Sequence, residues 1–438
     1  MTNTRMPARR AVVVGAGPVG CLAAQVLAAR GYTVEVYEKR PHYVASGLRY
    51  DGRTINLSLS PRGVDALDGK CSRAELAGLV VPMDSRARHG LDGDVSVAGY
   101  GRDDWQTLSI DRNDLNLLLM KNADAAPTVR FTFETECTGV DFDARRVSFA
   151  DRSGQAHHAD YDLLVGADGT HSAVRGRLAE QGLTQSRQQQ VGAEYREVTI
   201  LAEGAEGAEG AEDNAAADRR PSSAIHIWPR EGYFMVGLPN RDGSLRCTLV
   251  LPRDGALTFA DLATDEAVLA LLRRDFPEEA DRIRLAEPDP SRAPVSSISV
   301  VSCSPVVHDG SVLLLGDAAH TVAPFLGQGV NLGLEDCAVL ERLLEKWPDD
   351  QGAVLAEFQR ERVPEHEAAS ALSLANYVEL SGTGPAPGRS DVPPLPALVN
   401  FVSPSYQEAL DIYSGDRRAP GAIAQQQPTI AQQQPTGG

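Results

Sequence analysis

The sequence predicts an α/β protein in which a Rossmann-like parallel domain is interleaved with a mostly antiparallel β-sheet domain and followed by C-terminal helices. A strand, a glycine-rich turn, a helix and a second strand fit residues 11–38, and buried strands ending in turns recur at 160–168 and 311–317. Alternating strands lie between these two, at 223–228, 233–238 and 245–251. A parallel pattern that is interrupted and then resumes indicates two interleaved domains.

Composition narrows the classes of partner. The chain has 438 residues, 42% of them apolar, and a formal net charge of −18. This acidic balance argues against nucleic acid or an anionic membrane surface as the main partner. The six cysteines form no C-x-x-C pair, which argues against zinc and iron–sulfur sites and suits a reduced cytosol. We therefore expect a cytoplasmic protein without a metal site.

The apolar run at 11–29 is read as strand, turn and helix rather than as a membrane span, because glycines and a proline interrupt it. Strand 11–14 leads into Gly15-x-Gly17-x-x-Gly20, helix 21–30 follows, and strand 33–38 ends in Glu38. The three glycines permit a tight turn, close approach to a pyrophosphate and close packing of helix on strand. A carboxylate at the position of Glu38 binds a ribose hydroxyl and repels a 2′-phosphate. The unit predicts bound FAD or NAD.

Two further turns favour FAD over NAD. Asp168-Gly169 ends a strand before a helix that begins at Ser172, and Gly316-Asp317 ends another strand seven residues before Pro324. Either aspartate alone would also suit a helix cap. Together they suit a cofactor whose ribityl hydroxyls need acceptors far from the adenosine. A glycine-rich loop then opens a helix at about 330–347, whose N-terminus would favour the negative charge of a reduced flavin.

These elements divide the chain into five parts. We expect an FAD-binding domain, a substrate domain built on a sheet, a return to the FAD-binding domain, a helical region and a disordered tail. Their boundaries are 8–182 (with 72–104 contributing to the substrate domain), 183–300 (with an acidic loop at 203–218), 301–348, 349–412 and 413–438. The acidic loop and the Gln/Pro-rich tail bury too little apolar surface to fold by themselves.

Taken in order, these three motifs resemble the set found in single-component flavoprotein aromatic hydroxylases of the p-hydroxybenzoate hydroxylase fold. The resemblance runs from about residue 10 to 412. It implies non-covalent FAD, reduction by NADPH or NADH as co-substrate, and O2 that forms a C4a-hydroperoxyflavin and hydroxylates an activated aromatic ring. The cofactor-binding residues that it implies are Gly15, Gly17, Gly20, Glu38, Asp168 and Asp317.

Within that fold the sequence resembles the kynurenine 3-monooxygenases, through residues 52–60, 100–104, 109–116, 226–229 with 238–240, and 376–380. This implies hydroxylation of L-kynurenine to 3-hydroxykynurenine. The further cofactor-binding candidates are Arg40, Arg53, Arg112, Gly329, Val330 and Asn331, and the residues expected to face the flavin are Pro324, Phe325 and Gly329. The implied substrate site contains Arg86, Tyr100, Asn376 and Tyr406, with the arginine and both tyrosines on one carboxylate. Arg88 is a rival to Arg86.

Other interpretations fit the same residues. A hydroxylase of another carboxylated aromatic compound in a secondary-metabolite pathway, a flavin reductase or dehydrogenase, and a non-catalytic FAD-binding protein are the alternatives. His89 and His320 are candidate bases, but an aminoaryl ring is already activated by its amine, and we interpret His320 as structural. The expected partners are the small-molecule substrate, O2 and NAD(P)H, without nucleic acid or membrane, for a monomer or homodimer.

Overall fold

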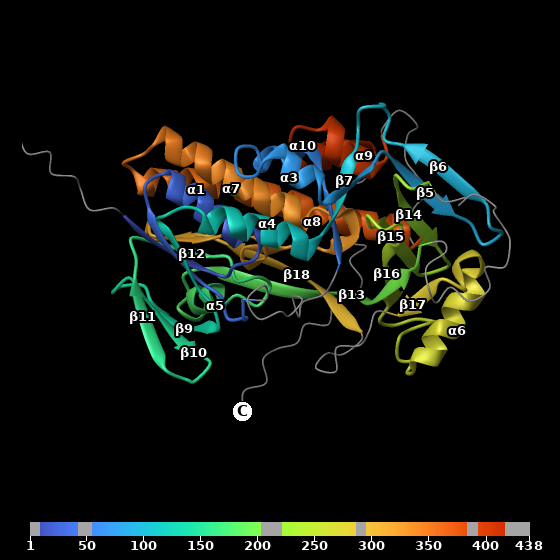
Figure 1. The fold of residues 1–438 in the computed structure, drawn as a ribbon, viewed down its shortest axis with the longest axis horizontal. Coiled ribbons are helices and arrows are strands. Elements are labelled where there is room, and N and C mark those ends of the chain that lie inside the picture. The colour runs from blue at the N-terminus through green and yellow to red at the C-terminus, as the bar shows by residue number, and fades with distance from the viewer. Residues whose placement is uncertain (1–8, 43–54, 203–220, 286–294, 383–392, 417–438) are drawn as a thin grey trace, which may run out of the picture.

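The computed structural model describes residues 9–42, 55–202, 221–285, 295–382 and 393–416. Arg53, the acidic loop at 203–218 and the tail from residue 417 onward lie outside the described residues. Figure 1 shows an elongated molecule with helices along one side and strands running through its length. The parallel sheet, the mostly antiparallel sheet and the C-terminal helices confirm the predicted fold class.

The first sheet has six strands in the order β19-β20-β12-β1-β2-β8, and all but the edge strand β19 are parallel. Helices α1, α4 and α7 lie together along one side of it in Figure 1, and a small antiparallel sheet, β9 to β11, lies on the other. The strands are β1 (Arg10–Val14), β2 (Thr33–Tyr37), β8 (Val129–Thr132), β9 (Thr135–Asp141), β10 (Arg146–Asp151), β11 (Ala156–Asp160), β12 (Leu163–Gly166), β19 (Val307–His308) and β20 (Val312–Leu314). The helices are α1 (Pro18–Ala29), α4 (Arg112–Asp124), α5 (Ala173–Glu180) and α7 (Gly329–Lys346).

The second large sheet has nine strands and is mostly antiparallel. Its order is β21-β18-β13-β16-β15-β14-β5-β6, with β17 paired to β13, and only β14 and β5 run parallel among the described pairs. The strands are β5 (Ser85–His89), β6 (Val95–Gly99), β13 (Gln185–Ile200), β14 (Ala224–Pro229), β15 (Phe234–Pro239), β16 (Leu245–Pro252), β17 (Ile283–Leu285), β18 (Ser296–Ser304) and β21 (His320–Thr321). Helix α6 (Asp265–Asp275) packs at its end beside the 3₁₀ turn Pro277–Glu279.

The remaining elements connect these sheets. A three-stranded sheet joins β3 (Asn56–Leu59), β7 (Thr107–Asp111) and β4 (Val80–Met83), with α2 (Pro61–Ala66) and α3 (Arg73–Ala77) nearby in sequence. Two 3₁₀ turns, Gly316–Ala318 and Pro324–Leu326, precede α7. The C-terminal region consists of α8 (Gln351–Leu380), α9 (Leu395–Ala397), a π-helical turn (Leu398–Val402) and α10 (Tyr406–Asp416).

Apolar burial follows this division. The largest buried cluster fills the space between the six-stranded sheet and helices α1, α4 and α7. A second cluster lies under α6, and a third joins the loop before α7 to α8 and α10. All six cysteines are free thiols. The site region is therefore supported on one side by the parallel sheet and on the other by the C-terminal helices.

Two element boundaries differ from the expected ones. Helix α1 begins at Pro18 rather than Cys21, because proline at the first helical position has a suitable φ and loses no hydrogen bond. Helix α10 continues to Asp416, which corrects the expected start of the tail at residue 413. The side chains of Ala409 and Tyr413 are buried against α8, so tertiary packing extends the helix.

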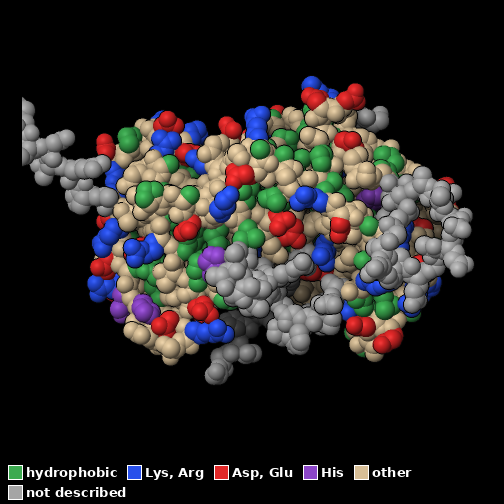
Figure 2. All heavy atoms as spheres, in the orientation of Figure 1, with side chains coloured by type: hydrophobic (Ala, Val, Ile, Leu, Met, Phe, Trp, Pro, Cys, Tyr) green, Lys and Arg blue, Asp and Glu red, His purple; other side chains and the backbone are tan. Residues whose placement is uncertain are grey.

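In the described part of the chain no helix combines the length and the apolar character needed to cross a bilayer. Figure 2 shows acidic and basic side chains interspersed over the face that it draws.

The turn between β1 and α1 requires glycine at two positions for packing reasons. Gly15 has a φ of +101°, and a Cβ there would lie 2.4 Å from the carbonyl oxygen of Ala167. A Cβ on Gly20 would lie 2.0 Å from the carbonyl oxygen of Gly15. Around Gly17, by contrast, a Cβ would meet nothing within 4 Å. The first and third glycines serve packing, and the second leaves space above the turn.

We expect Gly20→Ala to lower the free energy of unfolding by about 1–3 kcal/mol, because the added methyl group collides with backbone that cannot move alone. Gly176→Ala is the matched control: this glycine lies inside α5, where a Cβ meets nothing within 4 Å. It should instead stabilise the protein by about 0.4–1 kcal/mol, since alanine restricts the unfolded chain. Chemical denaturation of both variants measures the difference, and equal effects would contradict the packing argument.

Candidate active site

The turn after β1 is built to receive a dinucleotide. Helix α1 has no side-chain cap on its first N–H groups, so they remain available to a pyrophosphate. Glu38 is fixed beside this turn: its carboxylate accepts hydrogen bonds from the backbone N–H of Ala16 (2.8 Å) and of Arg40 (2.9 Å). A pocket adjoins the carboxylate. It is lined by Ala16, Gly17, Glu38, Arg40, Pro41, Asn116, Met120 and Phe133.

The two aspartate turns are held together. Arg175 donates to the carbonyl oxygens of Thr170 (2.6 Å) and Ala318 (2.9 Å), and so links the turn after Asp168 to the turn that contains Asp317. One oxygen of Asp168 accepts from the backbone N–H of Ala173 at 2.7 Å, at the start of α5. Its other oxygen, Oδ1, is buried without a hydrogen-bond partner, and burial raises the pKa of this carboxyl.

These observations test whether FAD fits the residues present. An unpartnered buried carboxylate oxygen needs a donor, and a ribityl hydroxyl supplies one. The N-terminus of α7 also has no side-chain cap and no acidic residue in its first turn, so the N–H groups around Gly329 and Val330 can face a reduced flavin. With the open space above Gly17 and the fixed carboxylate of Glu38, these donors and acceptors suit FAD.

The loop that precedes α7, residues 324–329, is clamped by polar side chains. Asn376 donates to the carbonyl oxygen of Phe325 at 2.7 Å, and Gln328 donates to Asn400 at 2.9 Å. Tyr406 donates its hydroxyl proton to Gln328 at 2.9 Å. Asn331 donates to Gly327 and Ser58 and accepts from the N–H of Ser60. The loop is therefore positioned from three sides.

These contacts change the interpretation of three sequence-predicted residues. Tyr406 is fully buried, and its hydroxyl already donates its one hydrogen bond to Gln328. The hydroxyl is therefore not available to donate to a substrate carboxylate. Asn376 likewise uses its amide on the loop beside the expected flavin. The side chain of Asn331 is occupied by protein, which leaves only its backbone for a cofactor.

Arg86 and Tyr100 meet where β5 and β6 pair. Within the described residues, the Arg86 guanidinium forms no hydrogen bond or ion pair, and burial lowers its pKa. The hydroxyl of Tyr100 is also buried, beside the hydroxyl of Thr107 but without a well-formed hydrogen bond, and burial raises its pKa. The two side chains interact electrostatically. Arg88 lies on the same face of β5 but is exposed, so geometry favours Arg86 over Arg88.

Phe234, Tyr377, Glu379 and Phe401 were not predicted as site residues, whereas Phe325 was expected to face the flavin. Phe325 of the loop stacks on Tyr377 of α8 at 4.5 Å between ring centroids, and Phe234 meets Phe325 edge-on at 5.9 Å. Phe401 packs against Tyr100 at 5.0 Å, and Glu379 acts electrostatically on Arg86. Tyr377 and Glu379 lie in the stretch 376–380, from which the sequence analysis selected only Asn376, so a signal that could have found them was present.

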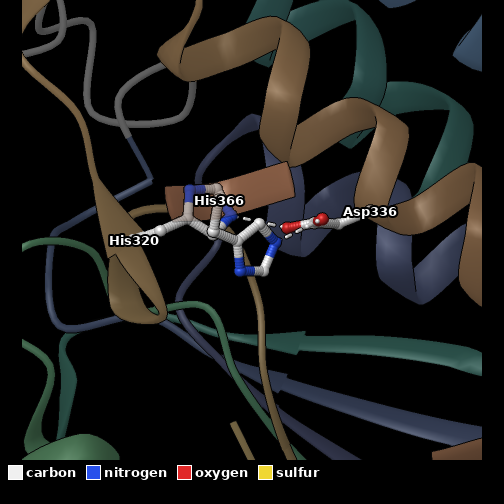
Figure 3. Close-up of side chains that lie close together, drawn as sticks. All are labelled: His320, Asp336 and His366. Carbon is white, nitrogen blue, oxygen red and sulfur yellow. Dashed lines mark hydrogen bonds and ion pairs between the residues drawn. The ribbon is translucent and has the colours of Figure 1, made fainter. Parts of the chain in front are cut away.

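A buried ionic cluster lies behind the loop, as Figure 3 shows. The carboxylate of Asp336 on α7 interacts with Nε2 of His320 (2.6 Å), Nε2 of His366 (2.9 Å) and Nε of Arg362 (2.7 Å). These contacts hold the pKa of Asp336 well below its usual range despite complete burial. His320 therefore has the structural environment expected for it, and Asp336 was missed.

The composition of this cluster would also suit a metal ion, since two histidines and an aspartate converge. Its geometry suits hydrogen bonding better. Both carboxylate oxygens of Asp336 already accept hydrogen bonds. Arg362 and His366 donate to the same oxygen, and the guanidinium there would repel a cation. We interpret the cluster as a hydrogen-bonded support for the loop.

Comparisons with known proteins identify the family of the chain. The FAD binding domain family matches residues 9–372. Relatives named kynurenine 3-monooxygenase occur in Salinispora arenicola (38% identical over 376 residues, 85% of this chain and 80% of the relative) and in Myxococcus xanthus (38% over 375 residues, 84% and 77%). A relative of the same name from Legionella pneumophila is 33% identical over 369 residues, covering 84% of this chain and 79% of the relative.

Solved structures show the same fold. The tetrameric form of 2-methyl-3-hydroxypyridine-5-carboxylic acid oxygenase superposes with a TM-score of 0.68 at 20% identity, covering 92% of this chain and 96% of that one. PqsL from Pseudomonas aeruginosa, a probable FAD-dependent monooxygenase, gives a TM-score of 0.65 at 22% identity, covering 85% and 96%.

We expect the buried His366 to make the protein acid-sensitive. Burial and the neighbouring His320 lower the pKa of His366 to about 4. Between about pH 6.5 and pH 4 the unfolded chain binds a proton that the folded protein does not, so stability falls on acidification by about 3 kcal/mol. In His366→Gln the amide can still donate to Asp336, and denaturation at pH 7, 6 and 5 should show a shallower loss. His158→Gln, at an exposed histidine on β11, should keep the wild-type dependence. A wild-type slope in His366→Gln would contradict the assignment.

Proposed function

The chain belongs to the kynurenine 3-monooxygenase family and is an FAD-dependent aromatic hydroxylase, and from that premise we propose that it converts L-kynurenine to 3-hydroxykynurenine. NADPH or NADH and O2 are the co-substrates. One oxygen atom of O2 enters the ring at the carbon beside the aromatic amine, and the other leaves as water with the two electrons of the nicotinamide.

One observation carries the substrate assignment: Arg86 is a largely buried guanidinium without a carboxylate partner among the described residues. A largely buried cation without a directly bonded carboxylate is costly, and a substrate carboxylate would supply one by a bidentate, charge-assisted contact. The unpartnered hydroxyl of Tyr100 would donate to the same carboxylate. Glu379 adds a negative charge near Arg86, which suits the ammonium group of an amino acid.

The aromatic part of the substrate has a matching surface. Phe325, Tyr377 and Phe234 form an apolar wall at the loop 324–329. Rings pack favourably on such a surface, so the substrate ring would lie against the loop while its amino acid group extends to Arg86. Asn376 and Tyr406 act in this proposal by positioning the loop rather than by binding substrate.

Bound FAD supplies redox chemistry with nicotinamide and O2. The chain binds it through the α1 turn, Glu38, Asp168, Asp317 and the α7 N-terminus. The substrate amine already donates electrons to the ring carbon, so no side chain has to remove a proton from the substrate beforehand. The protein therefore contributes orientation and the exclusion of water.

The proposal is tested by incubating the purified protein with L-kynurenine and NADPH, then NADH, in air. We expect 3-hydroxykynurenine, with about one nicotinamide oxidised per product. Nicotinamide oxidation that yields only hydrogen peroxide with kynurenine would overturn the substrate assignment, and product from a different carboxylated aromatic compound would replace it. A flavin that is never reduced would overturn the enzyme's proposed cycle.

The carboxylate contact predicts a graded series of variants. Arg86→Ala should raise KM for kynurenine roughly ten- to a hundredfold, and Tyr100→Phe roughly fivefold, because a charge-assisted bond is worth more than a neutral one. Arg86→Lys should recover only part of the loss, since an ammonium group cannot form the two-point contact. The matched control is Arg88→Ala, which should keep the wild-type KM because its side chain is exposed. FAD content should stay normal throughout. A loss in Arg88→Ala without one in Arg86→Ala would show that the wrong arginine is assigned.

A further inference from the structure

A line of ion pairs leads from the cluster behind the loop towards the C-terminal segment. Glu335 and Asp336 are neighbours on α7, and Arg362 of α8 donates to both, at 2.9 Å and 2.7 Å. The other oxygen of Glu335 pairs with Arg62 of α2 at 3.4 Å. Only 11% of the side-chain surface of Arg62 and 21% of that of Glu335 is exposed to solvent. Glu335 therefore joins two guanidinium groups at the edge of the protein interior.

Arg62 also binds the backbone of the C-terminal segment 399–404. It donates to the carbonyl oxygens of Val399 (3.3 Å), Pro404 (2.8 Å) and Ser403. Its guanidinium also lies over the ring of Tyr406, 4.9 Å from the centroid. One side chain on α2 thus holds the backbone of residues 399–404, which lie more than three hundred positions later in the chain.

The segment 399–404 contacts the candidate substrate site through Phe401. Phe401 packs on Tyr100 and stacks on Trp105, each at 5.0 Å between ring centroids. Tyr100 is the neighbour of Arg86. Residues 399–404 therefore cover the side of the site where the amino acid group of the substrate is proposed to bind.

We propose that Glu335 is a positioning residue that keeps the segment 399–404 closed over the substrate site. Its negative charge orients Arg62 towards the backbone carbonyls, and without that charge a largely buried guanidinium would be left with neutral partners alone. Such a cation is drawn to solvent, because burying a charge without its counter-ion is costly. The segment that depends on Arg62 would then open more often.

Closure matters for the reaction because reduced flavin has two outcomes with O2. In a closed site one oxygen atom is transferred to the ring and water is formed. In an open site two electrons from NAD(P)H reduce O2 to hydrogen peroxide and no substrate bond changes. This consequence rests on the proposed function, whereas opening of the segment can be measured without it.

The test uses Glu335→Gln in the FAD-loaded enzyme. Glutamine keeps the size and one acceptor oxygen, and it leaves the Arg362–Asp336 pair in place. We expect backbone amides of residues 398–413 to exchange with deuterium about tenfold faster, as local opening becomes about 1.4 kcal/mol easier. The yield of hydroxylated product per NAD(P)H should fall about fivefold or more while peroxide rises, and FAD content should stay at the wild-type level.

Glu341→Gln provides a matched control on the same helix. Glu341 pairs with Lys70. The exposed fractions of these two side chains, 24% and 12%, are close to those of Glu335 and Arg62. Lys70 follows α2, but its ion pair does not involve the C-terminal segment. Exchange at 398–413 and the product yield should therefore match wild type. Arg62→Lys is a second variant: one ammonium group cannot serve three carbonyls and a carboxylate, so it should resemble Glu335→Gln.

The outcomes separate the two proposals. Wild-type exchange at 398–413 in both Glu335→Gln and Arg62→Lys would overturn this inference whatever the activity. Equal acceleration in Glu341→Gln would also overturn it, since the effect would then be general to α7. If the wild-type enzyme makes no hydroxylated kynurenine, the proposed function fails, and the exchange experiment still decides the role of Glu335.

Discussion

The carboxylate of Asp336 is the constraint on which the site depends. It has no exposed surface, and a buried carboxylate without donors would cost several kcal/mol. Its side-chain donors come from two segments, His320 from the loop after Asp317 and Arg362 and His366 from α8, while Asp336 itself lies on a third, α7. Helix, loop and C-terminal helix therefore cannot separate without exposing or stranding a charge. The loop 324–329 lies between His320 and α7, so both of its ends are fixed by one side chain.

Local motifs explain why much of the fold could be predicted from the sequence. Each of three turns can be recognised within about ten residues of sequence: the turn after β1, the one at Asp168 and the one at Gly316. This is possible because the glycines and aspartates that identify each turn lie in the turn itself. The interactions that position the site are not local. Arg62 contacts carbonyls near residue 400, and Tyr406 contacts Gln328, through side chains whose partners no spacing rule identifies. The sequence predicts Tyr406 as a substrate-binding residue, but a single tyrosine does not reveal which acceptor its hydroxyl will find.

Two arginines illustrate how structure separates a supporting residue from a binding residue. Arg362 and Arg86 are both largely removed from solvent. Arg362 pairs with Glu335 and Asp336, and these carboxylates raise its pKa although burial acts in the opposite direction. Arg86 has no such partner among the described residues, and burial lowers its pKa. Arg362 is bonded directly to carboxylates of the protein, whereas Arg86 interacts electrostatically with Glu379 but forms no ion pair with a described residue. In the sequence they are the same residue type, so only the arrangement of charges around them assigns their roles.

The acidic net charge of the chain affects large and small anions differently. A net charge of −18 would oppose an extended anion such as nucleic acid, which meets many surface charges at once. A small anion meets only the charges within its own site, because salt screens exposed charges over about 8 Å. Under the proposed function the groups nearest these anions are positive: helix N-termini would face the cofactor phosphates and the flavin, and Arg86 would face the substrate carboxylate. Low dielectric inside the site strengthens these few contacts relative to the many screened charges outside. An acidic protein can therefore bind an anionic cofactor and an anionic substrate group.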